Sequence, residues 1–246
     1  MKPRYLAYII LLLLIMPSFA HAEEKIRAAV AANYIQTMKE LAVEFEAGTG
    51  IKVEATFTSS GNLYSQIIHG APYDIFLSAD EDRPNRLYQE GLAEEPFIYA
   101  IGKVVLWSAK KDFCKTGDWH EALKRESVKK IALANPDIAP YGMAAMRAMK
   151  DTQSREALQG KLVIAQDIAQ AFQYASSEAV DAGFCALSAT LTDAGKKGCF
   201  FMVAQAPPVV QAACVLKGKN RPAVSRFALF LISSEAEVIK KKYGYR

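Results

Sequence analysis

The stretch that decides the fold runs from Lys25 to Gly61 and reads KIRAAVAANYIQTMKELAVEFEAGTGIKVEATFTSSG. Residues 25–32 favour a β-strand, and residues 35–46 place apolar side chains at helical spacing. Gly48 and Gly50 then predict the end of that helix, and residues 52–57 alternate as a strand does. A strand, a helix and a second strand in this order predict a parallel sheet with right-handed crossovers.

The alternation of strands and helices continues along almost the whole chain. Further strands are expected at 74–77, 104–108, 131–134, 162–165, 184–187, 200–203 and 209–216, and a last helix at 223–241. The expected fold class is α/β, with two lobes that each contain a doubly wound sheet flanked by helices. Residues 23–107 and 213–246 are expected to form lobe 1, and residues 108–212 lobe 2. Such a two-lobed chain closes around ligands like a clamshell.

The first 22 residues have the parts of a secretory signal peptide. Lys2 and Arg4 form a basic start, residues 6–16 are apolar, and the sequence AHA at 20–22 fits the cleavage rule. This apolar run is shorter than the roughly 18 to 20 residues needed to span a bilayer. We therefore expect cleavage before Glu23 and a periplasmic location, with an uncleaved anchor as the alternative.

The charge of the chain is nearly balanced. The formal net charge is +4 for the 246 residues, and it falls to +2 without residues 1–22, which contain Lys2 and Arg4 and no acidic residue. This balance gives no support for nucleic-acid binding.

The four cysteines, Cys114, Cys185, Cys199 and Cys214, are far apart and form no C-x-x-C pair. Zinc or thioredoxin-like chemistry therefore has little support. An oxidising compartment permits disulfides, and four cysteines allow three complete pairings, among which the sequence does not choose. Cys185 and Cys214 lie in apolar strand-like runs, where a small buried hydrophobic role is at least as good an interpretation as a bridge.

Candidate binding residues lie where strands give way to helices. Four such junctions contain Asn33, Ser60, Tyr141 and Ile168, and none supplies a cation at its turn. Helix N-termini have unpaired N–H groups and a partial positive charge, so several that converge form an anion site without Arg or Lys. Each residue also has a simpler interpretation, since Asn and Ser are common helix caps, Tyr141 fits a surface turn and Ile168 a buried first turn.

An enzymatic function has little support in the sequence. Beyond residue 22 the histidines are His69 and His120, and there is no H-E-x-x-H motif, G-x-S-x-G elbow or phosphate-binding G-x-x-x-x-G-K loop. The acidic run at 80–82 fits a solvated turn better than a catalytic pair. We therefore expect a binding protein and not an enzyme.

Ordered motifs across the chain resemble the periplasmic molybdate-binding proteins of molybdate ABC transporters. The matching stretches are VAAN at 30–33, FEAGTG at 45–50, SSG at 59–61, QIIHGAPYDIFLSAD at 66–80, YAIGKVVLWSAK at 99–110 and NPDIAPYG at 135–142. The resemblance covers nearly all of the chain after residue 22. It implies a two-lobed periplasmic binding protein fold of type II, with the anion in the cleft.

The resemblance also implies a ligand, its contacts and a partner. Carried over onto this sequence, the oxyanion-binding residues are Ala32, Asn33, Ser60, Tyr141 and Ile168, the last through its backbone N–H. Many members have a Tyr where this chain has Ala186, and the Tyr141 hydroxyl is expected to compensate. The implied ligand is molybdate or tungstate, bound without a cofactor or direct cation ligands. The implied partner is the membrane permease of an ABC transporter. A monomer is expected; binding of another oxyanion such as sulfate, or a sensing role, is the alternative.

A site made of hydrogen-bond donors favours a fully deprotonated dianion. Such a site gives the O–H group of hydrogenphosphate no acceptor, and an unpaired polar group in a dry site is costly. Molybdate and tungstate share the dianionic form and nearly the same size. Sulfate is smaller and would not reach all donors of a pocket sized for molybdate.

Overall fold

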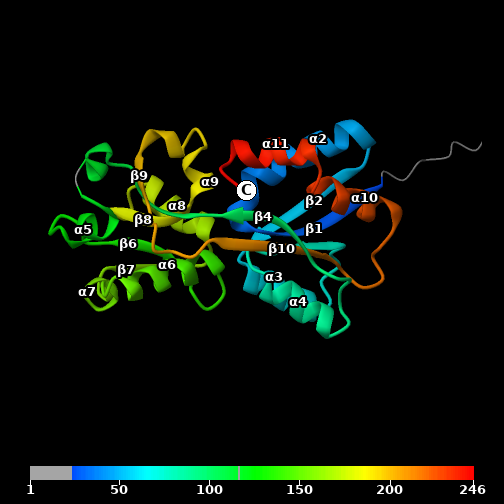
Figure 1. Ribbon diagram of the computed structural model, residues 1–246, viewed down its shortest axis with the longest axis horizontal. Helices are drawn as coiled ribbons and strands as arrows, with labels where there is room; N and C mark the ends of the chain where they lie inside the picture. Colours follow the sequence, from blue (N-terminus) through cyan, green and yellow to red (C-terminus); the bar gives the residue numbers. More distant parts are fainter. Residues whose placement is uncertain (1–23, 116) are drawn as a thin grey trace, which may run out of the picture.

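The computed structural model describes residues 24–115 and 117–246, so the expected signal peptide lies outside the described residues. The described chain forms two five-stranded sheets that lie side by side, each covered by helices (Figure 1). We call the first sheet with its helices lobe 1 and the second sheet with its helices lobe 2.

Lobe 1 has the strand order β2-β1-β3-β10-β4. Its strands are β1 (Lys25–Ala31), β2 (Lys52–Thr58), β3 (Ile75–Leu77), β4 (Phe97–Gly102) and β10 (Val209–Val215). Its helices are η1 (Ala32–Tyr34), α2 (Ile35–Thr49), α3 (Ser60–Ile68), α4 (Asp82–Gln89), α10 (Pro222–Leu231) and α11 (Ser234–Lys242). The buried face of α2 contributes Met38, Leu41 and Phe45 to the lobe 1 core, where the ring of Phe45 packs against Phe227 of α10.

Lobe 2 has the strand order β7-β6-β8-β5-β9. Its strands are β5 (Val104–Ser108), β6 (Ile131–Ala134), β7 (Leu162–Ala165), β8 (Ala182–Ala186) and β9 (Cys199–Met202). Its helices are η2 (Lys111–Cys114), α5 (Trp119–Lys124), α6 (Pro140–Asp151), α7 (Arg155–Gln159), α8 (Ile168–Ser176), α9 (Leu187–Thr190) and η3 (Gly195–Lys197).

The two sheets are mixed, whereas the sequence predicted parallel sheets. Strands β2, β1 and β3 are parallel, but β10 pairs antiparallel with β3 and β4. Likewise β7, β6 and β8 are parallel, and β5 pairs antiparallel with β8 and β9. The antiparallel pairs involve the strands by which the chain passes between lobes. Strands β4 and β5 are separated by Lys103 alone, so no crossover helix can return the chain in the parallel direction.

The chain changes sheets at Lys103 and again before Val209. The predicted lobe boundaries lie a few residues later in the chain, after residues 107 and 212. The division of the chain into lobes at those two positions stays a prediction. Both crossings lie between the two halves in Figure 1, and the carboxyl end of the chain lies beside them. There the backbone of Arg246 exchanges two hydrogen bonds with Ile101 of β4, which holds the adjacent Tyr245 at the lobe junction.

The predicted last helix is broken in two. The chain leaves the helix after Leu231, and the Ser233 side chain accepts a hydrogen bond from Ala236 N–H and starts α11. Leu229 and Ile232, which the sequence pattern directs toward the core, are 68% and 53% exposed.

Cys114 of η2 and Cys199 of β9 form a disulfide that closes a separation of 85 residues in lobe 2. Cys185 and Cys214 are buried free thiols, in agreement with their interpretation as small apolar residues. Burial raises the pKa of the Cys214 thiol to about 12, so both its position and its protonation make it unreactive. In the described part of the chain, no helix has the length and apolar character needed to cross a membrane.

Candidate functional site

The four predicted strand-to-helix junctions meet around one narrow cavity between the lobes. Its lining contains all five residues predicted to bind an oxyanion, which are Ala32, Asn33, Ser60, Tyr141 and Ile168. The cavity has about 200 Å³ of space not occupied by atoms, open solvent included, of which about 10 Å³ can hold the centre of a water molecule. Lobe 1 contributes the starts of η1 and α3, and lobe 2 contributes the starts of α6 and α8.

Ser60 is buried at the first position of α3, and its neighbour Ser59 acts as the helix cap. The Ser59 hydroxyl accepts a hydrogen bond from Asn62 N–H at 3.3 Å. The Ser60 hydroxyl instead accepts from the Ala79 N–H, which follows β3, at 2.9 Å. A hydroxyl oxygen has one proton to donate. Since no described acceptor takes the Ser60 proton, that proton is available to the cavity.

Asn33 is held by hydrogen bonds through its side chain and its backbone. Its Nδ2 donates to Gln211 Oε1 at 2.8 Å and to Tyr245 Oη at 3.0 Å. Its carbonyl oxygen accepts from Tyr245 Oη at 2.8 Å and from Ser188 Oγ at 2.9 Å. Both N–H bonds of the side-chain amide are therefore used within the protein, and Oδ1 is buried without a described partner. The sequence left two interpretations of this side chain, a helix cap and a donor to an anion, but its N–H groups bond Gln211 and Tyr245. What remains for an anion at this junction are the backbone N–H groups at the start of η1.

Tyr141 is the second residue of α6, and its side chain is buried at the lobe junction. Its hydroxyl accepts a hydrogen bond from Gln211 Nε2 of β10 at 3.3 Å and lies beside Tyr245. Burial, together with the neighbouring Tyr245, raises the pKa of Tyr141 well above its usual value, so this phenol stays a donor. Its helix is preceded by Ala139, which has no capping side chain, and begins with Pro140, which has no N–H. The interpretation of Tyr141 as a surface turn residue is wrong, since it is 1% exposed.

Ile168 is the first residue of α8, and its apolar side chain is buried. The preceding Asp167 caps this helix by accepting from Gln170 N–H at 2.9 Å, and Gln170 Oε1 accepts from Gln166 N–H at 2.7 Å. These caps leave the Ile168 N–H without a partner inside the helix. Like the N–H groups at the start of η1, the Ile168 N–H is a backbone donor without a partner in its own helix.

The cavity lining carries no positive side chain among the described residues, and Asp167 is its ionisable acid besides the phenol of Tyr141. The positive potential must therefore come from the helix N-termini. Arg83, the cation that follows β3, is paired with Asp80 and also donates to the Asp137 carbonyl oxygen at 3.4 Å. It braces the two lobes outside the cavity.

The lobes touch at Gly61, next to the cavity. Gly61 N–H donates to the carbonyl oxygen of Ile138 in lobe 2 at 2.8 Å. A β-carbon at Gly61 would lie 2.8 Å from Ile138 Cβ and 2.9 Å from Ile138 Cα, so only glycine permits this approach. We call this arrangement, with the lobes in contact beside the cavity, the closed form; residues of both lobes line the cavity in it.

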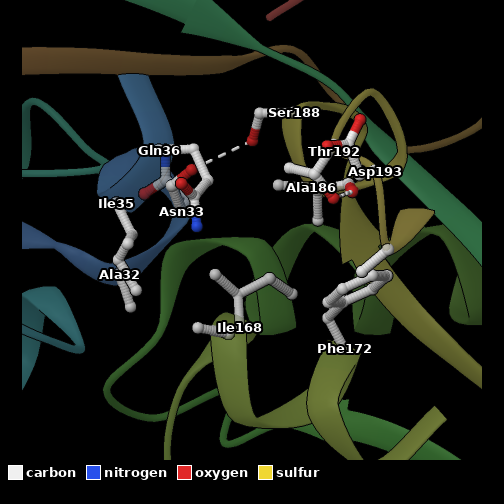
Figure 2. A pocket seen from close by; sticks show the side chains of 13 residues that line it. Ala32, Asn33, Ile35, Gln36, Ile168, Phe172, Ala186, Ser188, Thr192 and Asp193 are labelled. Atoms are coloured by element: carbon white, nitrogen blue, oxygen red, sulfur yellow. Dashed lines mark hydrogen bonds between the residues drawn. The ribbon is translucent and has the colours of Figure 1, made fainter. Parts of the chain in front are cut away.

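A second, larger cavity adjoins the first. Figure 2 shows Asn33 and Ile168 on its walls together with Phe172, Ala186 and Ser188. It contains about 870 Å³ of space not occupied by atoms and open to solvent. Ala186, the position where a Tyr was expected from the resemblance, lies at this second cavity and not at the first. Its small side chain leaves part of that space empty.

Sequence reasoning missed three residues around the narrow cavity: Ala79, Gln211 and Tyr245. Ala79 supplies a backbone N–H, which leaves no signal in the sequence. Gln211 and Tyr245 lie 178 and 212 residues from Asn33 in the chain, so local patterns could not associate them with it.

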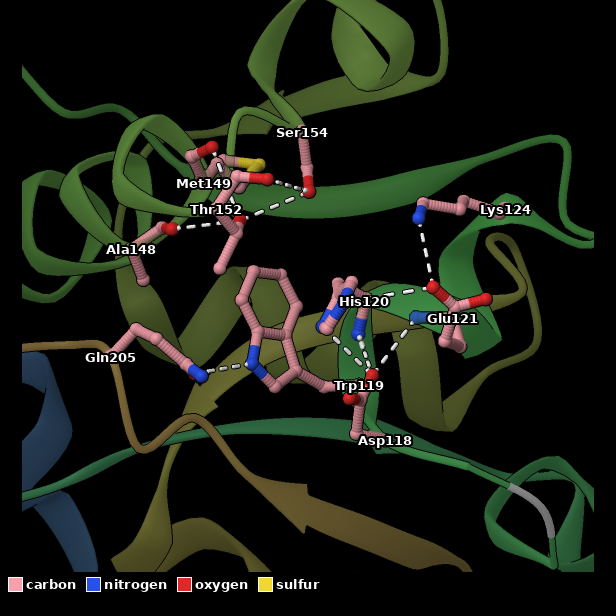
Figure 3. A network of polar contacts seen from close by, with 10 residues as sticks. All are labelled: Asp118, Trp119, His120, Glu121, Lys124, Ala148, Met149, Thr152, Ser154 and Gln205. Carbon is pink, nitrogen blue, oxygen red and sulfur yellow. Dashed lines mark hydrogen bonds and ion pairs between the residues drawn. The ribbon is translucent and has the colours of Figure 1, made fainter.

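The polar cluster around His120 caps and anchors helix α5. His120 lies at the start of α5 in lobe 2, where the Asp118 carboxylate caps the helix by accepting from His120 N–H and Glu121 N–H, each at 3.1 Å (Figure 3). Trp119 Nε1 donates to Gln205 at 2.7 Å and anchors the helix. Among residues 24–115 and 117–246, no group of three or more His, Cys, Asp or Glu side chains is placed to hold a metal ion.

Comparison with known proteins identifies relatives over nearly the whole chain. The model of the bacterial extracellular solute-binding protein family matches residues 26–246. The chain is 39% identical to the molybdate-binding protein ModA of Azotobacter vinelandii over 227 residues, covering 90% of this chain and 89% of the relative. It is also 39% identical to ModA of Rhodobacter capsulatus over 229 residues, covering 91% and 89%. The solved Azotobacter vinelandii periplasmic molybdate-binding protein superimposes with a TM-score of 0.84 and 34% identity, covering 90% of this chain and 98% of that one.

Proposed function

The chain belongs to the bacterial extracellular solute-binding protein family and, within it, to the molybdate-binding proteins, and on this premise we propose that it captures molybdate or tungstate in the periplasm. It then delivers the anion to the membrane permease of an ABC transporter. This is a binding function without a chemical reaction on the ligand.

The observation that carries the proposal is the convergence of four helix starts on one enclosed cavity with no cation in its lining. Each start contributes N–H groups that have no partner within their own helix. Their partial charges attract an anion, while the enclosed position removes competing water and strengthens each hydrogen bond.

In this proposal, donors from both lobes hold the oxyanion. The backbone N–H groups of Ala32 and Asn33 and the Ser60 hydroxyl bind it from lobe 1. The Tyr141 hydroxyl and the Ile168 N–H bind it from lobe 2. Asn33 acts through its backbone, because its side-chain N–H groups are already hydrogen-bonded to Gln211 and Tyr245.

The same donors account for selectivity. The two cavity hydroxyls already accept hydrogen bonds from the Ala79 and Gln211 N–H groups, so the proton of each can be donated to another acceptor. In this proposal that acceptor is the ligand, which for Tyr141 replaces the neighbouring Tyr245. A dianion with unprotonated oxygens satisfies these donors, whereas the O–H of hydrogenphosphate cannot pair with any of them. The acceptors among the lining residues are Asn33 Oδ1 and the Asp167 carboxylate, which already caps α8. Closure of the lobes through Gly61 and Ile138 fixes the spacing between donors, so the strength of binding depends on the size of the anion.

Thermal unfolding with separate anions tests the proposal. At about 100 times the dissociation constant, a ligand that binds only the folded state adds roughly 2.7 kcal/mol to the free energy of unfolding. We expect molybdate and tungstate to raise the melting temperature, and phosphate to leave it unchanged. A rise with sulfate but with neither molybdate nor tungstate would contradict the assignment.

A further inference from the structure

The two hydroxyls at the cavity share a feature that sets the direction of their protons. Ser60 Oγ accepts from the Ala79 N–H at 2.9 Å, and Tyr141 Oη accepts from Gln211 Nε2 at 3.3 Å. A hydroxyl group carries one proton and can accept at its lone pairs. When a buried N–H occupies a lone pair, the O–H bond must point to another acceptor.

The orientation of the Gln211 amide follows from its other neighbours. Gln211 is fully buried in β10, and its Oε1 accepts from Asn33 Nδ2 at 2.8 Å and from Tyr99 Oη at 3.1 Å. Tyr99 has one proton, and its Oη also lies 3.1 Å from Ser78 O, so Asn33 Nδ2 is the donor that keeps this orientation. The NH₂ group of the same amide then faces Tyr141. Asn33 Nδ2 in turn lies between two acceptors, Gln211 Oε1 and Tyr245 Oη, so neighbouring amides support one another's orientation.

We propose that Gln211 is a positioning residue for the oxyanion, which directs the Tyr141 proton into the cavity without touching the ligand itself. The inference rests on the proposed oxyanion-binding function. Without an anion, Tyr245 Oη lies beside Tyr141 as an alternative acceptor. A bound dianion is the stronger acceptor, because hydrogen bonds to charged groups are roughly twice as strong as those between neutral groups.

Gln211 also makes the direction of the Tyr141 O–H bond depend on lobe closure. It belongs to β10 of lobe 1, whereas Tyr141 belongs to α6 of lobe 2, so the Gln211–Tyr141 hydrogen bond joins the lobes. When the lobes part, Tyr141 loses this donor and its proton is free to turn. Gln211 therefore orients the Tyr141 hydroxyl only in the closed form that holds the anion.

A double-mutant cycle tests the inference. Molybdate affinity is measured by calorimetry for the original protein and for Gln211→Met, Tyr141→Phe and the double variant. Methionine keeps the length of glutamine and removes its hydrogen bonds. If Gln211 acts through the Tyr141 hydroxyl, Gln211→Met lowers affinity about tenfold in the original protein and less than about twofold when residue 141 is Phe. Gln205→Met is the control, since Gln205 also accepts from an aromatic side chain but its described partner is Trp119 of α5, whereas Gln211 bonds Tyr141 of the cavity lining; it should leave affinity unchanged.

The outcomes separate this inference from the function on which it rests. If the unmodified protein does not bind molybdate, the proposed function fails and this inference fails with it. If it binds, but Gln211→Met has the same effect in both backgrounds, Gln211 supports the fold in a general way and the positioning role is refuted. Urea unfolding of each variant without anion shows whether a loss of affinity merely follows a loss of stability.

Discussion

Replacing Gly61 by Ala should weaken anion binding without weakening the fold. Gly61 is the second residue of α3, and its N–H donates to Ile138 of lobe 2 at 2.8 Å. A new β-carbon would lie 2.8 Å from Ile138 Cβ and 2.9 Å from both Ile138 Cα and Ile138 O. Two of these three atoms are backbone, so no rotation of a side chain relieves the clash.

The size of the effect follows from the shift that the β-carbon requires. Carbon atoms rest about 3.5–4.0 Å apart, so the lobes must separate by roughly 0.7–1 Å at this point. The Gly61–Ile138 hydrogen bond then lengthens to about 3.6 Å and is lost, which costs about 0.5–1.5 kcal/mol. Displaced donors add to this loss, and we expect a fall in affinity of tenfold or more, about 1.4 kcal/mol. The open form has no clash, and Ala in a helix is favoured over Gly by about 1 kcal/mol.

Calorimetry with molybdate and urea unfolding without anion measure the two effects separately. Gly48→Ala is the matched control, because Gly48 also lies in a helix, α2, and an added β-carbon there meets no atom within 4 Å. We expect Gly48→Ala to bind as the original protein does, and Gly61→Ala to lose affinity at unchanged or higher stability. Equal affinities for the two variants would refute the role of the Gly61–Ile138 contact in closing the site.

Three further changes probe the donors and the surrounding phenols. Ser60→Ala removes one donor to a charged ligand and should weaken binding by about 1.5–3 kcal/mol. Ser59→Ala removes a helix cap and should cost about 1 kcal/mol of stability. Equal effects of the two changes on molybdate affinity in calorimetry would contradict the separate roles of ligand donor and helix cap. Ala186→Tyr in the Tyr141→Phe background should leave the weakened affinity unrestored, because Ala186 lies at the second cavity and not at the narrow one; full recovery of binding would show that both walls reach the same ligand oxygen. Burial raises the pKa of Tyr34, Tyr99 and Tyr141 well above the usual value. Their contribution to stability is therefore complete below about pH 10, where unfolded tyrosine titrates, and is lost as the pH rises further; urea midpoints that stay constant from pH 9 to 11 would refute it.

The positions of the candidate site residues were predictable because each belongs to a local pattern. A strand end followed at once by a helix start can be recognised within a few residues, as at Asn33 and Ser60. The carboxyl ends of neighbouring strands lie at the same edge of a sheet, so such junctions converge once the fold class is known. The mixed direction of the sheets was not predictable from the same patterns. It depends on where the chain crosses between lobes, and at Lys103 a single residue separates strands of different sheets.

The atoms that face the cavity were harder to predict than the residues. The sequence left the Asn33 side chain as a helix cap or a donor to the anion, yet its two N–H groups bond Gln211 and Tyr245, which lie far along the chain. A hydroxyl or amide has few donors, and each partner that takes one removes it from the ligand. Donor direction in a buried site is therefore a property of the whole network, fixed by long-range contacts. For this reason a substitution at Gln211, a residue that no junction motif contains, is a sharper test of the site than another change at Asn33.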